Sequence, residues 1–155
     1  VPCIIVDVPN VWAPWVRYTL INADEVIITA TPDLACLRNT KNMVDLLKQA
    51  RPNDHLPRIV LNQVGVPKRP EVTAADFAKA IGITPSLVIP YDPVTFGTAQ
   101  SNGQMLVEVG PKSKPVEQVD MLADILSGNS RVAAKSGGKF NLNEIFQKLP
   151  SLRKK

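Results

Sequence analysis

The chain has 155 residues, of which 45% are hydrophobic and 21% charged; these proportions suit one globular domain with a buried core and exclude a disordered chain. The net charge of +4 would suggest a nucleic-acid binder, but residues 131–155 carry seven bases and one acid, whereas residues 1–130 carry eleven bases and thirteen acids. The net charge is therefore −2 for residues 1–130 and +6 for residues 131–155. We expect no specific nucleic acid as a partner, and the basic end of the chain favours an anionic membrane surface or a protein as its partner.

Signals for membrane insertion, secretion and zinc binding do not stand out in the sequence. No apolar run reaches the roughly 18 residues of a membrane span, and the first residues do not resemble a signal peptide. Cys3 and Cys36 fall in segments that we predict as strand and helix, which suits buried thiols in a reducing compartment. His55 is the single histidine, and without a Cys-x-x-Cys pair there is no credible zinc site. We expect a soluble, intracellular protein.

Four apolar runs predict β-strands, at residues 3–6, 25–29, 58–62 and 87–90. Each run is short, rich in β-branched side chains and without strict alternation, as expected of parallel strands that are buried on both faces. The first run opens the chain with no lead-in turn. We therefore interpret the sequence as a piece of a longer protein.

Helical patterns follow each of these runs. The second helix starts near Pro32 and Asp33 and ends before Pro52; the third has Thr73 as its cap and stops at Gly82. The alternation of strand and helix predicts an α/β fold with a doubly wound, mainly parallel sheet and helices on both faces. The other predicted helices cover residues 15–23, 98–108 and 116–126.

The last part of the chain differs from the rest in composition. Residues 127–139 are small and polar and predict a flexible linker, and residues 140–155 predict a basic amphipathic tail. One interpretation places this tail in the interface of an anionic membrane; the alternatives are packing on its own domain or a partner, or disorder. The apolar face consists of Leu142, Ile145, Phe146 and Leu149, and the basic side chains are Lys148, Arg153, Lys154 and Lys155.

Polar residues follow three of the predicted strands, where ligands bind in open α/β sheets. Asp7 after the first strand stands where nucleotide triphosphatases hold magnesium through a water or orient the attacking water; alternatively it caps the next turn. Asn62 after the third strand can pair with an adenine edge or bridge two loops. Residues 90–93 and 96–104 follow the fourth strand.

These motifs together resemble the MinD/ParA superfamily of deviant P-loop ATPases. They are Asp-x-Pro at residues 7–9, Leu-Asn-Gln-Val-Gly at 61–65, Ile-Pro-Tyr-Asp-Pro at 89–93, and Phe-Gly-Thr-Ala with Asn-Gly-Gln in 96–104. More closely, the chain is similar to the CpaE/TadZ group of Flp (tight adherence) pilus-assembly proteins, above all in residues 31–39 and 60–70. The resemblance covers about residues 1–126.

The resemblance implies a homodimeric ATPase-type protein that binds ATP and Mg²⁺ in its intact form. It would position the pilus secretion machinery at the inner membrane, peripherally on the side of the bacterial cytoplasm and commonly at a pole. Asp7 would take the Walker B or switch II position and hold magnesium indirectly, Asn62 would read the adenine, and Pro90, Tyr91 and Asp92 would border the base.

One element of the family is missing from this sequence. No Gly-x-x-x-x-Gly-Lys-Ser/Thr occurs, and residues 136–140 have neither its spacing nor its hydroxyl residue. We therefore interpret residues 1–126 as the C-terminal portion of a P-loop NTPase-like ATPase domain without the phosphate loop. Such a chain is expected neither to bind the cofactor nor to hydrolyse ATP alone. The alternatives are an active MinD/ParA-type ATPase with a phosphate loop upstream, and a DNA-partitioning ATPase, which the acidic body disfavours.

Overall fold

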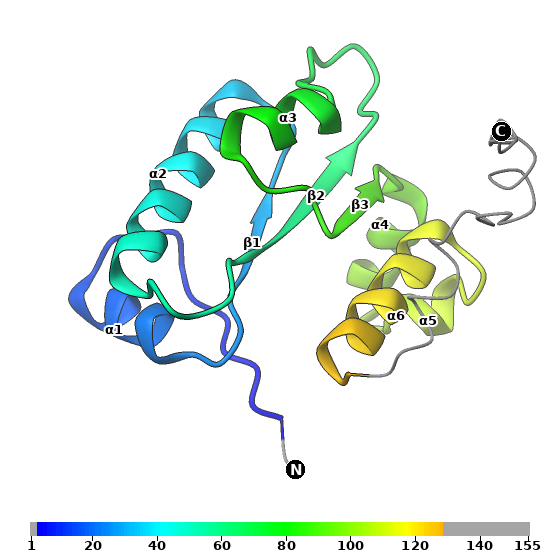
Figure 1. The fold of residues 1–155 in the computed structure, drawn as a ribbon. Coiled ribbons are helices and arrows are strands. Elements are labelled where there is room, and N and C mark those ends of the chain that lie inside the picture. The colour runs from blue at the N-terminus through cyan, green and yellow to red at the C-terminus, as the bar shows by residue number, and fades with distance from the viewer. Residues whose placement is uncertain (1–2, 129–155) are drawn as a thin grey trace, which may run out of the picture. The chain divides into compact units, whose positions relative to one another are not determined.

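The structure, a computed structural model, describes residues 3–128 (Figure 1). The chain divides into two units, Val1–Gln118 and Val119–Lys155, and the first holds the sheet and the candidate site residues that the structure describes. The predicted linker and tail lie outside the described residues, apart from Ser127 and Gly128. The elements in chain order are α1 (Pro14–Asn22), β1 (Ile27–Ala30), α2 (Leu34–Ala50), β2 (Arg58–Val64), α3 (Ala74–Ile81), β3 (Leu87–Pro90), α4 (Pro93–Asn102), α5 (Leu106–Val109) and α6 (Lys114–Leu126).

The three strands form a parallel sheet in the order β1-β2-β3. Ile28 of β1 lies beside Ile59 of β2, and Val60 of β2 beside Leu87 of β3. A helix joins each pair of neighbouring strands, as parallel pairing requires, and these two helices, α2 and α3, pack against each other (Figure 1). The predicted α/β class with a parallel sheet is confirmed.

One main core lies between the sheet and helices α2 and α3. Its side chains alternate along β2 and come from one face of each helix, as the two periodicities require. A smaller cluster joins α1 to the start of β1 and the end of α2, through Val16, Leu20, Val26 and Leu47. The main core consists of Ala30, Val44, Ile59, Leu61, Phe77 and Ile81, each at most 4% exposed.

Local sequence signals place the ends of the two core helices. Asp33 caps α2 by accepting a hydrogen bond from the Cys36 N–H at 2.8 Å. Thr73 caps α3 by accepting from the Asp76 N–H at 3.1 Å, and Gly82 ends it in the left-handed region, at φ 73°. Because these caps are sequence features, the predicted bounds of both helices lie within two residues of the observed ones.

The opposite face of the sheet is covered unevenly. Val60, Leu87 and Ile89 point to this face and are buried. On β1, however, Ile27 is 37% exposed and Thr29 is exposed as well. The sheet is therefore closed on this face along β2 and β3 and open along its β1 edge.

The predicted strand at residues 3–6 is wrong in the described chain. This segment pairs with no strand, and Ile4 and Ile5 are 84% and 87% exposed. A β-branched run becomes a buried strand only when neighbours hydrogen-bond to it, and the described sheet stops at β1. The side chains of Trp12, Trp15 and Tyr18 are also at least half exposed, so this end of the described chain presents an apolar surface.

The single helix predicted over residues 98–108 is also wrong. Asp92 and Pro93 start α4 earlier, because the aspartate caps the helix and proline suits its first turn. Gly103 then ends α4 with a left-handed backbone, at φ 63°, and α5 begins separately after Met105. The sequence held both signals, a Pro after a capping Asp and a Gly at the helix end.

Candidate functional site

The carboxyl ends of β2 and β3 lie side by side and bring two of the predicted segments together. Val64 pairs with Pro90, and the Tyr91 N–H donates to the Val64 carbonyl at 2.8 Å. Asn62, at the same end of β2, is therefore next to the strand that delivers Pro90, Tyr91 and Asp92. This edge of the sheet is where open α/β folds bind ligands.

Asn62 stands in an irregular stretch of β2. The pairing with β3 shifts register between Leu61 and Val64, and Gln63 has φ +55°. The Asn62 Oδ1 accepts from the Gln63 N–H at 2.8 Å, while its Nδ2 has no hydrogen-bond partner within residues 3–128. Two amide hydrogens are thus available to an acceptor such as a ring nitrogen of a purine.

Asp92 serves as the N-terminal cap of α4. Its carboxylate accepts from the Thr95 N–H at 3.0 Å and from the Thr95 Oγ1 at 2.7 Å. The backbone hydrogen bond from Thr95, followed by that from its hydroxyl, lowers the pKa of Asp92. The carboxylate is therefore ionised at neutral pH and already engaged, whereas the neighbouring Tyr91 side chain is exposed.

Two helix N-termini at this edge, those of α2 and α4, are capped by a carboxylate. Asp33 caps α2 as Asp92 caps α4, and the Cys36 backbone N–H is the main cause of its lowered pKa. Each carboxylate accepts from one of the N–H groups that could otherwise hold a phosphate, and it adds a negative charge beside the others. The N-termini of α2 and α4 therefore disfavour a phosphate.

Asp7 is not part of this arrangement. It lies in the segment before α1, is exposed, and its carboxylate makes no hydrogen bond or ion pair with residues 3–128. Because residues 3–6 do not join the sheet, Asp7 does not stand at the end of a strand here. No group of three or more His, Cys, Asp or Glu residues that could hold a metal ion occurs in the part of the chain that the structure describes.

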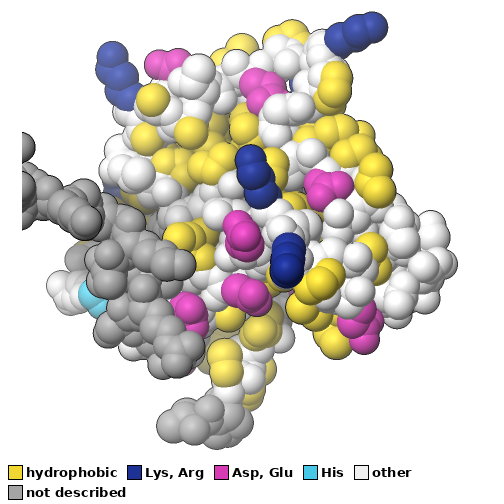
Figure 2. Space-filling model, turned by 90° about the vertical axis from the view of Figure 1, so that its right-hand side faces the viewer, with side chains coloured by type: hydrophobic (Ala, Val, Ile, Leu, Met, Phe, Trp, Pro, Cys, Tyr) yellow, Lys and Arg dark blue, Asp and Glu magenta, His cyan; other side chains and the backbone are white. Residues whose placement is uncertain are grey.

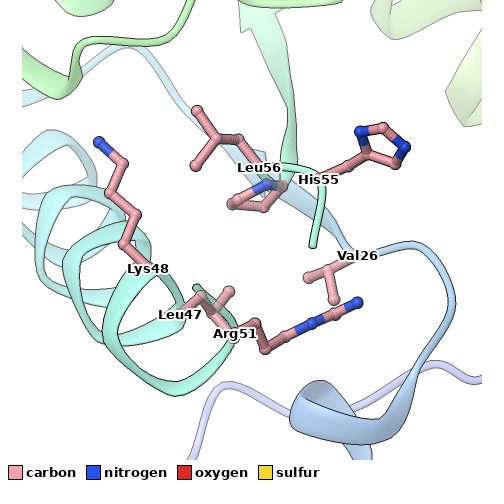
Figure 3. Close-up of a pocket in the computed structure, with 7 residues that line it drawn as sticks. Val26, Leu47, Lys48, Arg51, His55 and Leu56 are labelled. Atoms are coloured by element: carbon pink, nitrogen blue, oxygen red, sulfur yellow. The ribbon is translucent and has the colours of Figure 1, made fainter. Parts of the chain in front are cut away.

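Two hollows lie at the other end of the sheet, near the start of β1 and the end of α2. The first has room for about one water molecule, at ≈ 10 Å³, and its lining includes Val26, Leu47 and Arg51 (Figure 3). The second is a wider polar groove, whose lining includes Arg51 and Asp54. Arg51 is held there by the Leu20 carbonyl at 3.0 Å and by Asp54 at 2.7 Å. Since ligands of open α/β sheets bind at the carboxyl ends, we do not place the site in these hollows.

The loop between β2 and α3 contains two residues, Arg69 and Glu71, for which we predicted no role. Glu71 accepts hydrogen bonds from the Gly65 N–H at 2.9 Å and the Val66 N–H at 3.1 Å, and it pairs with Arg69 at 2.9 Å. Arg69 in turn donates to the carbonyl oxygen of Gln63. No motif marked these contacts, because they join residues whose mutual distance depends on the path of the loop.

The three-stranded parallel sheet with its helices matches a fold of the P-loop NTPase type, as the following comparison shows. The chain is similar to the crystal structure of a ParA family ATPase from Chlorobium tepidum, with a TM-score of 0.57 and 26% identity over 71% of this chain. The match spans 43% of that ATPase, so this chain covers less than half of its length. This neighbour supports the resemblance to the MinD/ParA superfamily and has no bearing on pilus assembly.

No protein-family model matches the chain, and no curated protein does. Within residues 3–128, no helix is long and apolar enough to cross a membrane.

The capping carboxylate of α2 predicts a measurable acid dependence of stability. Because the pKa of Asp33 is lowered in the folded state, its contribution is present above the unfolded pKa of about 4 and is lost as the pH falls through the folded pKa. Asp33→Asn keeps a good cap without a titrating group. We expect the free energy of unfolding of this variant, measured by urea unfolding, to be nearly unchanged at pH 7. Between pH 4 and 2.5 it should fall less steeply than that of the unaltered chain. An equally steep fall would contradict the role of Asp33.

Proposed function

We propose that this chain belongs to an ATPase-like assembly and localisation factor for Flp-type pilus biogenesis, which positions the secretion machinery at the inner membrane. The observation that carries the proposal is the pairing of Val64 with Pro90, which sets Asn62 beside the Ile-Pro-Tyr-Asp segment. Those two motifs resemble the CpaE/TadZ group, and the similarity to a ParA family ATPase supports the wider superfamily.

In this proposal the described edge supplies the adenine-binding half of the nucleotide site. Asn62 donates from Nδ2 to the base, and Pro90 and Tyr91 border its ring. ATP and Mg²⁺ would bind in a longer protein whose phosphate loop supplies the backbone N–H groups that the capped helices do not offer. Asp7 would contribute at the Walker B position only when that part of the domain is present.

The proposed partners follow from the same resemblance and from the charge of the chain. Nucleotide binding would favour a homodimer, and the dimer would contact proteins of the pilus secretion machinery. The tail at residues 140–155, with its excess of basic side chains, would attract an anionic surface. The proposed location is peripheral, at the cytoplasmic face of the inner membrane and commonly at a pole.

Deletion of the gene tests the biological role. We expect cells without it to lose Flp-type pili, seen by electron microscopy, and to regain them when the gene is returned on a plasmid. Normal piliation in the deletion strain would overturn the proposal, whatever nucleotide the protein binds.

Asn62→Ala tests the adenine site. In the longer, nucleotide-binding form we expect about a tenfold loss of affinity for ATP in calorimetric titration, because one hydrogen-bonding contact to the base is removed. Thermal unfolding should change little, since Asn62 is only half-buried. Asn102→Ala, a change of the same kind at an exposed residue of α4, serves as the control and should leave affinity unchanged. Equal affinities of the Asn62 variant and the unaltered protein would remove this residue from the site.

Two other functions remain as alternatives. An active MinD/ParA-type ATPase would hydrolyse ATP once its upstream sequence is included, which a phosphate-release assay detects. A DNA-partitioning ATPase would bind DNA with strong salt dependence after removal of residues 131–155. The face that Figure 2 shows does not favour DNA binding, because its basic side chains stand apart among acidic and hydrophobic ones.

A further inference from the structure

We propose that Arg69 and Glu71 are positioning residues for the adenine site: their ion pair holds Gln63 in its left-handed conformation and so fixes how Asn62 faces the ligand. We call this pair and its contacts the loop clamp. The inference rests on the proposed function, because Asn62 is its endpoint. It goes beyond that function in assigning roles to Arg69 and Glu71, which the proposed function does not use.

The loop clamp consists of the Arg69–Glu71 ion pair and the hydrogen bonds of this pair to the backbone and to the Gln63 side chain. Glu71 accepts from two successive backbone N–H groups, those of Gly65 and Val66, at 2.9 and 3.1 Å. Arg69 donates to Glu71 through Nη2 at 2.9 Å and through Nε at 3.3 Å. The same guanidinium donates to the backbone carbonyl of Gln63 and, at 3.4 Å, to its side-chain Oε1.

Gln63 is the residue that needs such support. Its φ of +55° lies in the left-handed region, which is unfavourable for a residue with a side chain. The conformation persists only where the surroundings hold it. Arg69 holds it from the carbonyl side, and the Asn62 Oδ1 holds its N–H at 2.8 Å.

This geometry couples the clamp to Asn62. While the Asn62 Oδ1 accepts from the Gln63 N–H, the amide plane of Asn62 is fixed and its Nδ2 is left for the ligand. If Gln63 returned to an extended conformation, its N–H would turn toward the ladder and the Asn62 amide would lose its anchor. Release of Arg69 or Glu71 therefore changes the presentation of Asn62 without touching the ligand.

The first experiment measures the clamp alone, on the chain as it is. We expect Glu71→Gln and Arg69→Met to raise the amide hydrogen-exchange rates of Gly65 and Val66 about tenfold, as for one lost charge-assisted hydrogen bond. Arg58→Met is the matched control, because Arg58 of β2 forms a second Arg–Glu pair within residues 3–128, with Glu25 at 3.2 Å. It should leave these two rates unchanged. Unchanged rates in the Arg69 and Glu71 variants would overturn the clamp.

The second experiment uses the longer, nucleotide-binding form. We expect Arg69→Met to weaken ATP binding about tenfold and Gln63→Gly, added to it, to restore affinity to within about twofold, because glycine adopts positive φ without support. Arg58→Met should not change affinity. A weakened Arg69 variant that glycine does not rescue would overturn the positioning role. If the unaltered protein binds no adenine nucleotide, the proposed function is overturned instead. The hydrogen-exchange rates would still test whether the loop clamp exists.

Discussion

Phe77→Ala is expected to lower the free energy of unfolding by about 3–5 kcal/mol, the largest effect of any single truncation that we predict. The Phe77 side chain of α3 is fully buried and lies in the main core with Ile59, Leu61 and Ile81. Its removal leaves a cavity between helix and sheet that these neighbours fill only in part. Urea unfolding followed by circular dichroism measures the change.

A domain of this size has a total stability of about 5–15 kcal/mol, so this variant will be largely unfolded under mild denaturing conditions. Leu34→Ala is the control, because Leu34 is a comparable apolar residue on α2 that is 74% exposed. Its expected effect is below about 0.5 kcal/mol. Similar losses for the two variants would mean that α3 does not cover the sheet as described.

The second large effect is a difference between the two faces of the sheet in the free energy of unfolding that an Ile→Ala change costs. Ile59→Ala on β2 is expected to cost about 2–5 kcal/mol, because Ile59 is fully buried under α2 and α3. Ile27→Ala on β1 removes the same atoms from a side chain that is 37% exposed on the opposite face, and we expect a loss of roughly 1 kcal/mol or less. Both values come from urea unfolding of the same chain.

The comparison is sharp because both residues are isoleucines on neighbouring strands of one sheet. If Ile27→Ala costs as much as Ile59→Ala, then the β1 edge is covered on the face where the structure leaves it open.

One part of the candidate site could be predicted from sequence motifs, and the other part depends on the path of a loop. Asn62 and Pro90 stand at the ends of apolar runs, and parallel strands carry their carboxyl ends to one edge, so the shared edge could be predicted from the strands. Their proximity also requires β2 and β3 to be neighbours, which the structure shows. The caps of the helices were equally visible in the sequence. Arg69 and Glu71 were not, because their contacts with Gln63 and Gly65 depend on a left-handed backbone at a residue that is not glycine.

By itself the sequence determined the parallel α/β class, three of the strands, the caps of α2 and α3, and the separation of a weakly acidic body from a basic end. These depend on near neighbours in the chain: hydrophobic period, capping side chains, glycine and charge. The tertiary structure alone decided that residues 3–6 remain outside the sheet, that the β1 edge is open on one face, and that Arg69 reaches Gln63. Each of these depends on which distant group is available as a partner, and a local pattern cannot specify that.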